Sequence, residues 1–233
     1  IRCGVHLMSI LFVLTSHDSF GDTGRDTGLW LEEFLVPYYA FVDAGFAVRL
    51  ASPKGGRAPV DPLSIDAFKD HPLYKRFGAD GVLKERLGST IKLSAIVDSQ
   101  VSALVYPGGH GPLWDLRRQP HSIALIESLL AQGKPVATIC HAGCALLDAR
   151  KRDGRPLVEG VQVTAFSDSE EAAVGLEKAV PYLVETDLKV LGAVYSKTLD
   201  WERHVVVSGA LITGQNPASS QGVAEAVIKQ LKA

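Results

Sequence analysis

One stretch, residues 135–147, constrains the fold of this chain more than any other part of the sequence. Residues 136–139 are apolar and partly β-branched, a pattern that predicts a buried parallel strand. The following segment is rich in small residues and leucine, which favours the start of a helix. Cys140 and His141 lie between the two segments. A sharp turn from strand to helix would present the thiol at the carboxyl end of the strand, so the stretch predicts a nucleophile elbow.

Strand-like and helix-like segments alternate along the rest of the chain. Buried strands are predicted near residues 10–15, 47–51, 103–106, 136–139 and 161–166, and a hairpin over 205–213. Helices are predicted near 28–44, capped by Asp26 or Thr27, near 122–132 and 181–192, and at the end of the chain. This alternation predicts an α/β fold, with an open, mostly parallel sheet and helices on both faces.

The composition limits the classes of protein to which this chain can belong. The chain has 233 residues, a formal net charge of −2 and three cysteines. The near-neutral charge gives no sign of a nucleic-acid partner, and no apolar run is long enough to span a bilayer. Three cysteines are too few for a disulfide framework in a chain of this size, so we expect a reducing, cytoplasmic setting.

Residues 1–7 precede the only methionine, Met8, and lack the apolar core of a signal peptide. We expect them to be a non-native extension, with a genuine extension as the alternative. Residues 8–233 contain no repeat, low-complexity tract or linker, so we expect them to form one domain.

Loops that follow parallel strands meet at one edge of the sheet, where ligands bind. Four loops should therefore converge, following the strands that end near Thr15, Tyr106, Ile139 and Phe166. The candidate groups on these loops are Asp18, Gly108, Gly109, His110, Cys140, His141 and the acidic run 168–171. His110 is either a donor in the pocket or an ordinary loop residue.

Cys140 is the candidate nucleophile, and an inert buried cysteine is the alternative. A nearby imidazole and a helix N-terminus both lower the pKa of a thiol, so we expect His141 and the elbow to activate Cys140. A third group normally orients such a histidine. Glu171 and Glu170 are the best candidates for this role, followed by Asp168.

Two adjacent acids, Glu32 and Glu33, lie among apolar residues of the first predicted helix. One should face the core and the other water, although two ordinary surface acids would show the same spacing. A carboxyl buried among apolar groups has a raised pKa and can remain protonated. Such a group could hydrogen-bond a thiolate and transfer protons.

No metal or organic cofactor is expected. The order Cys-His-x-x-Cys, formed by Cys140, His141 and Cys144, matches no standard zinc or haem spacing. The glycine-rich run at 108–111 lacks the spacing of a dinucleotide-binding loop. We therefore interpret Cys144 as a small core residue.

With these motifs, the chain from Met8 onward resembles the ThiJ/PfpI superfamily, which has a flavodoxin-like, class I glutamine amidotransferase-like fold. The glutathione-independent glyoxalase (glyoxalase III) branch, which also includes holding chaperones, is the most similar. The matching segments are 14–16, 27–28 with Glu33, 44–46, 107–111, 139–141, 163–167 and 213–219.

The resemblance implies that Cys140 is the nucleophile, His141 its partner, Glu33 the acid at the sulfur and Glu171 the third triad member. It implies a substrate- and oxyanion-binding site at Gly108, Gly109, His110 and Ala142, with the Gly109 N–H as a donor. It also implies a homodimer and a lyase (D-lactate dehydratase) that converts a small 2-oxoaldehyde, methylglyoxal, to lactate.

Two functions compete with the glyoxalase hypothesis, because one activated thiol serves all three. The first is a PfpI-type cysteine peptidase or amidase, and the second is a holding chaperone or cysteine redox sensor. The chain also departs from the family pattern Cys-His-Gly-Pro by having Ala142 and Gly143 after the reactive pair. Alanine is harder to place than glycine wherever φ is positive, which puts the elbow geometry in question.

Overall fold

The structure is a computed structural model that describes residues 9–233. The expectation about an extension at residues 1–7 concerns a segment outside the described residues. Within residues 9–233, no helix combines the length and the apolar character needed to cross a membrane.

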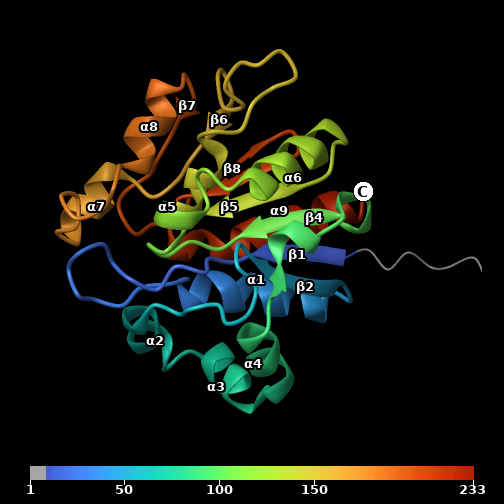
Figure 1. Ribbon diagram of the computed structural model, residues 1–233, viewed down its shortest axis with the longest axis vertical. Helices are drawn as coiled ribbons and strands as arrows, with labels where there is room; N and C mark the ends of the chain where they lie inside the picture. Colours follow the sequence, from blue (N-terminus) through green and yellow to red (C-terminus); the bar gives the residue numbers. More distant parts are fainter. Residues whose placement is uncertain (1–8) are drawn as a thin grey trace, which may run out of the picture.

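A seven-stranded sheet forms the centre of the molecule (Figure 1). Its strand order is β3-β2-β1-β4-β5-β9-β8, and every neighbouring pair is parallel except β8 with β9. The strands are β1 Ser9–Val13, β2 Ala47–Ser52, β3 Ile91–Lys92, β4 Ala103–Tyr106, β5 Val136–Ile139, β8 Val205–Ser208 and β9 Leu211–Gly214. This sheet confirms the predicted α/β fold class.

Helices cover both faces of the sheet, as Figure 1 shows. The longer ones are α1 Leu31–Asp43, α6 Pro120–Ala131 and α9 Ser220–Leu231. Shorter α-helices are α2 Pro62–Phe68, α3 Pro72–Ala79, α4 Gly81–Gly88, α5 Pro112–Asp115, α7 Asp168–Ala173 and α8 Val184–Val190. The 3₁₀ helices within residues 9–233 are η1 Leu93–Ala95, η2 Asp98–Gln100, η3 Cys140–Leu146 and η4 Pro217–Ser219.

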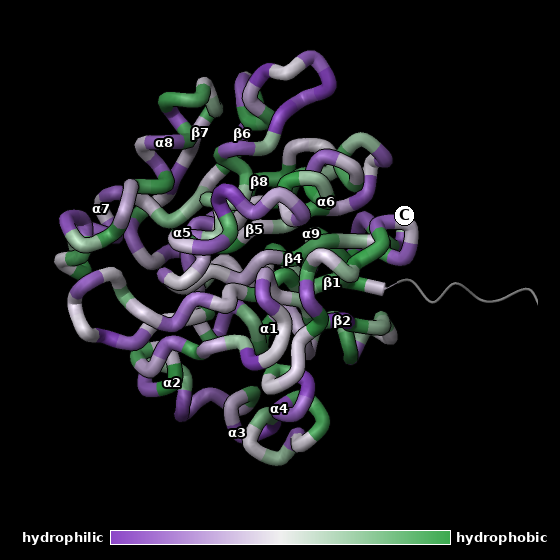
Figure 2. Tube along the Cα trace, viewed as in Figure 1, coloured by the Kyte–Doolittle hydropathy of each residue, from purple (hydrophilic) through white to green (hydrophobic). Residues whose placement is uncertain are grey.

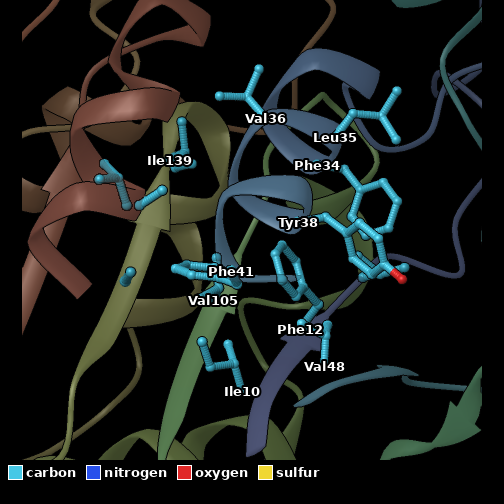
Figure 3. Close-up of a cluster of buried hydrophobic side chains, with 14 of the residues drawn as sticks. Ile10, Phe12, Phe34, Leu35, Val36, Tyr38, Phe41, Val48, Val105 and Ile139 are labelled. Atoms are coloured by element: carbon cyan, nitrogen blue, oxygen red, sulfur yellow. The ribbon is translucent and has the colours of Figure 1, made fainter. Parts of the chain in front are cut away.

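Alternate residues of β1 enter two separate hydrophobic clusters, because successive side chains of a strand point to opposite faces. Ile10 and Phe12 pack with residues of α1 and α9, whereas Leu11 and Val13 pack with residues of α6. In the first cluster, shown in Figure 3, the Phe12 ring meets the Phe34 ring edge-on at a centroid distance of 5.3 Å. The hydrophilic segments lie at the periphery, for example in the loop ahead of β6 (Figure 2).

The strand predicted at 161–166 is shorter and does not join the main sheet. Only β6, Gln162–Val163, is extended, and it pairs with β7, Val194–Tyr195, in a separate two-stranded sheet. The strand ends early because the Thr164 N–H bonds the Thr213 hydroxyl of β9, at 2.9 Å, instead of continuing a ladder. The neighbours of β5 in the main sheet are therefore β4 and β9, and the acidic loop follows a strand outside this sheet.

The first helix begins later than predicted. Trp30, not Asp26 or Thr27, is its N-cap, and no side chain caps it. Leu29 instead bridges to Val60, and the Trp30 N–H donates to the Gly108 carbonyl at 2.9 Å, which keeps this segment extended. The helix end is as predicted, with Gly45 at φ +88° just beyond it.

We expect Phe12→Ala to lower the free energy of unfolding by about 3–5 kcal/mol, because it removes a fully buried ring and leaves a cavity. Urea denaturation of both proteins measures this difference. The control is Val190→Ala, which alters an apolar side chain that is 79% exposed and should change stability by less than about 0.5 kcal/mol. Equal effects of the two substitutions would contradict the assignment of Phe12 to the core.

Candidate active site

Cys140 occupies the predicted sharp turn at the end of β5. Its φ is +60°, and only one other non-glycine residue within 9–233, Trp201, has a positive φ. This left-handed turn brings two consecutive side chains together, with Cys140 Sγ 3.2 Å from His141 Nδ1. A helix follows as predicted, and it is the 3₁₀ helix η3. The elbow is therefore present.

His141 is held by Glu171 of α7. His141 Nε2 lies 2.5 Å from Glu171 Oε2, and both side chains are buried. An ionised carboxylate can only accept hydrogen bonds, so this contact places the imidazole proton on Nε2. Burial, together with the neighbouring His110, lowers the pKa of His141 to about 4. The resting imidazole is neutral at pH 7, and its Nδ1 lone pair faces the thiol.

Glu171 contacts two histidines. His110 Nε2 lies 2.9 Å from Glu171 Oε1, and the His110 and His141 rings are 4.1 Å apart. Burial opposes ionisation of Glu171, but its interactions with both imidazoles outweigh this effect and hold its pKa far below the usual range. The His110 contact is one that the sequence left open, since a histidine in a glycine-rich loop carries no signal of its partner.

Glu170 points away from this cluster, which separates the two acids that the sequence could not distinguish. Its Oε2 accepts hydrogen bonds from the N–H and hydroxyl of Ser167, which caps α7. Its Oε1 accepts from Asn216 Nδ2 and from the Trp201 N–H. Asp168 bonds Thr186 through its Oδ2. Glu171 is therefore the acid that orients His141.

Glu33, in the first turn of α1, is fully buried, whereas Glu32 is partly exposed. Glu33 Oε2 accepts a hydrogen bond from the Gly108 N–H at 2.7 Å. Glu33 Oε1 has no hydrogen-bond partner among the described residues. Burial raises the pKa of Glu33 to about 8, against the opposing effects of the Cys140 thiol and the Gly108 N–H. Glu33 is therefore mostly protonated at pH 7 and electrostatically coupled to the thiol.

The prediction that the elbow lowers the pKa of Cys140 is wrong. Burial raises the pKa of the thiol well above its ordinary value, and the adjacent Glu33 adds to this effect. A cationic imidazole would oppose it, but His141 is neutral. The resting site therefore holds a neutral thiol beside the unprotonated Nδ1 of His141.

The glycine-rich loop after β4 contributes backbone rather than side chains. The Gly108 N–H is occupied by Glu33 and is not free for an oxyanion. A Cβ on Gly108 would lie 2.7 Å from Glu33 Oε2 and 2.9 Å from Cys140 Cβ, so only glycine allows this approach. The Gly109 N–H, at φ +88°, has no acceptor within residues 9–233.

Ala142 is fully buried in the core cluster that contains α6, and its φ is not positive. The alanine therefore causes no backbone strain in the elbow. Its side chain is not part of the cavity wall, and a role of its backbone in oxyanion binding stays a prediction. Cys144 is a core residue, as interpreted from the sequence, and its Sγ donates to the Pro112 carbonyl at 3.3 Å.

A cavity of about 150 Å³ opens beside the sulfur. Most of its wall is apolar or aromatic, with a few polar residues that include Arg25, Asp61, His110 and His141, a combination typical of small-molecule sites. Its wall includes Phe20, Trp30, Gly109, His110, Cys140 and Phe166. The loop after β1 reaches the cavity as predicted, through Phe20 and Arg25, but Asp18 itself is not part of the wall.

In the part of the chain that the structure describes, one group of side chains has ligand atoms close enough to share a metal ion. Its members are His110, His141 and Glu171, whose ligand atoms lie within 4.8 Å of one another. Both imidazoles, however, already direct their Nε2 atoms at the carboxylate. The cluster is thus a hydrogen-bonded unit that supports the elbow.

Comparisons with known proteins agree with this architecture. The model of the DJ-1/PfpI family matches residues 27–230. Glutathione-independent glyoxalase HSP31 of Saccharomyces cerevisiae is 31% identical, over 96% of this chain and 98% of the yeast protein. Among solved structures, Rapid Encystment Protein 24 kDa of Francisella tularensis aligns with a TM-score of 0.92 and 32% identity, over 96% of this chain and 99% of that one. Glyoxalase III of Candida albicans aligns with a TM-score of 0.89 and 25% identity, over 97% and 98%.

The raised pKa of Glu33 predicts a pH dependence of stability. Between its ordinary value of 4.5 and about 8, the folded chain keeps a proton that the unfolded chain has lost. This group therefore makes stability fall as the pH rises through that window. We expect Glu33→Gln, which has no proton to lose, to be more stable at pH 7 by roughly 3 kcal/mol.

Urea denaturation at several values between pH 5 and pH 8 measures this effect in both proteins. The exposed Glu177 provides a control, because Glu177→Gln should leave the pH dependence unchanged. A Glu33→Gln protein that keeps the wild-type slope would show that Glu33 is ionised in the folded state.

Proposed function

Since this chain belongs to the DJ-1/PfpI family, we propose that it is a glutathione-independent glyoxalase that converts methylglyoxal to lactate through Cys140. One observation supports this assignment above the others. The sulfur lies between a neutral imidazole, His141, and a buried carboxyl, Glu33, whose pKa of about 8 makes both of its protonation states accessible near neutrality. Such a pair suits a reaction that moves protons twice at adjacent carbons.

The first step is addition of the thiol to the aldehyde. The Cys140 proton moves to His141 Nδ1 while the sulfur attacks the aldehyde carbon. The carbonyl oxygen becomes an oxyanion, for which the free Gly109 N–H is the proposed donor. The oxygen then takes the proton from His141, which gives a neutral hemithioacetal and restores the imidazole.

The second step moves a hydrogen between the two carbons. The ionised form of Glu33 takes the proton from the former aldehyde carbon, which gives an enediolate. The protonated Glu33 returns the proton to the neighbouring carbon, and the hydroxyl proton moves to the new alcohol oxygen. The product is a lactyl thioester on Cys140. His141, which directly follows Cys140 in the sequence, is the alternative group for this proton transfer.

The third step is hydrolysis. Neutral His141 takes a proton from water, and the hydroxide attacks the thioester carbonyl. The carbon–sulfur bond breaks, and the thiolate recovers its proton from His141. Lactic acid leaves and loses a proton to solvent to become lactate. The reaction needs no glutathione, metal or organic cofactor, and we propose D-lactate as the enantiomer, a homodimer as the assembly and the cytoplasm as the location.

We expect the purified protein to form lactate from methylglyoxal without glutathione, and Cys140→Ala to abolish this activity. Glu33→Gln should reduce kcat by at least about 100-fold, because a general acid–base group contributes at least that factor to the rate. An assay with an enzyme specific for each lactate enantiomer measures rate and stereochemistry together.

The matched control is Cys144→Ala, which removes a second buried thiol outside the cavity wall and should retain lactate formation. Absence of lactate from the wild-type protein, combined with hydrolysis of aminopeptidase substrates, would replace the glyoxalase assignment with the peptidase alternative. Equal lactate formation by Cys140→Ala would rule out the thiol mechanism.

A further inference from the structure

Trp201 is an aromatic residue that the chemistry above does not use. Its ring is part of the cavity wall beside Cys140, yet its side chain is 48% exposed. We propose that Trp201 and Phe166 form a platform that binds the substituent of the 2-oxoaldehyde, so that the enzyme prefers a flat apolar substituent to the methyl group of methylglyoxal. This inference rests on the proposed glyoxalase function and specifies its substrate class.

The backbone at Trp201 is held in an unfavourable conformation. Its φ is +69°, in the left-handed region that a bulky residue rarely adopts, and the only other such non-glycine residue within 9–233 is the nucleophile. Conformations of this kind persist only where the surroundings hold them, and they are concentrated at functional sites.

Glu170 supplies the group that holds it. This carboxylate is fully buried, and its Oε1 accepts the Trp201 N–H at 2.9 Å. The same oxygen accepts Asn216 Nδ2 at 2.8 Å, which ties the loop to the segment after β9. Glu170 is therefore a positioning residue. It holds the backbone of Trp201, whose half-exposed side chain is part of the cavity wall.

The rings form a continuous aromatic surface that leads to the catalytic imidazole. The Trp201 and Phe166 ring centroids are 5.8 Å apart, and those of Phe166 and His141 are 4.2 Å apart. A substrate bound to Cys140 thus has an aromatic wall next to it, and aromatic groups pack favourably in offset or edge-on contacts.

Two further apolar side chains, Leu63 and Val174, are both exposed and part of the same cavity wall. Single exposed apolar residues need no explanation, but three around one opening beside a nucleophile indicate a surface that a ligand covers. A phenyl or branched alkyl substituent offers this apolar wall more contact area than the methyl group of methylglyoxal does.

Initial rates with methylglyoxal and phenylglyoxal test the proposal, with lactate and mandelate as the measured products. We expect the wild-type protein to have the higher kcat/KM for phenylglyoxal. Trp201→Ala should lower the ratio of the two kcat/KM values, phenylglyoxal over methylglyoxal, by about tenfold, mainly through KM. Trp201→Phe should keep most of this ratio, because it retains an aromatic ring.

Leu199→Ala is the matched control, since Leu199 is 77% exposed, lies two residues away and is not part of the cavity wall. It should leave the ratio unchanged. A ratio that Trp201→Ala does not change, or a wild-type preference for methylglyoxal, would overturn the platform.

A second measurement separates this inference from the proposed function. Phenacyl bromide and bromoacetone alkylate a thiol without any turnover and differ only in phenyl against methyl. Mass spectrometry of Cys140 gives their rates, and Trp201→Ala should slow phenacyl bromide selectively, by about tenfold. Selective slowing without any oxoaldehyde turnover would support the platform and reject the glyoxalase assignment. Equal rates in wild type and Trp201→Ala would reject the platform.

Discussion

The left-handed turn at Cys140 is the constraint on which the rest of the site depends. In an extended strand, the side chains of Cys140 and His141 would point to opposite faces. A φ of +60° at Cys140 reverses this and leaves Sγ 3.2 Å from Nδ1. The turn costs free energy for a residue with a Cβ, so its neighbours must stabilise it. The buried strand β5 precedes it, and the Phe166 N–H donates to the Cys140 carbonyl at 3.3 Å.

Two buried carboxyls around this turn have opposite protonation states, and the proposed chemistry depends on this difference. Interactions with two imidazoles keep Glu171 ionised, whereas burial raises the pKa of Glu33 more than the hydrogen bond from the Gly108 N–H lowers it, so that Glu33 is mostly protonated. Pairs of acids whose environments separate their pKa values are a general sign of assigned acid and base roles. Burial of Glu33 lowers the free energy of unfolding at pH values above the ordinary pKa of this carboxyl.

Sequence patterns predicted those parts of the structure that local physics decides. Apolar, β-branched runs located β4 and β5 to the residue, and Gly45 marked the end of α1. The patterns failed where tertiary contacts decide. The segment at 161–166 looks like a core strand, but a side-chain bond from β9 ends it, and no local pattern shows that.

The same division applies to the candidate site. The spacing of apolar residues predicted that either Glu32 or Glu33 is buried, but it could not say which one. Glu170 and Glu171 are consecutive in the sequence, so the pattern could not show which of them contacts His141. Both answers depend on distant partners, Gly108 for Glu33 and His110 for Glu171. The direction of the Cys140 pKa was predicted wrongly because the degree of burial, which dominates it, is not readable from a motif.

The departure from the family pattern after the reactive pair can now be explained physically. The strained position of the elbow is Cys140 itself, so Ala142 needs no left-handed backbone. Gly143 is the position that tolerates nothing larger, because a Cβ there would lie 2.8 Å from the Ala165 Cβ. Ala165 directly precedes Phe166, whose N–H donates to the Cys140 carbonyl. The small residue at 143 thus lets the segment after β6 approach the elbow, which brings both the aromatic wall and Glu171 to the sulfur.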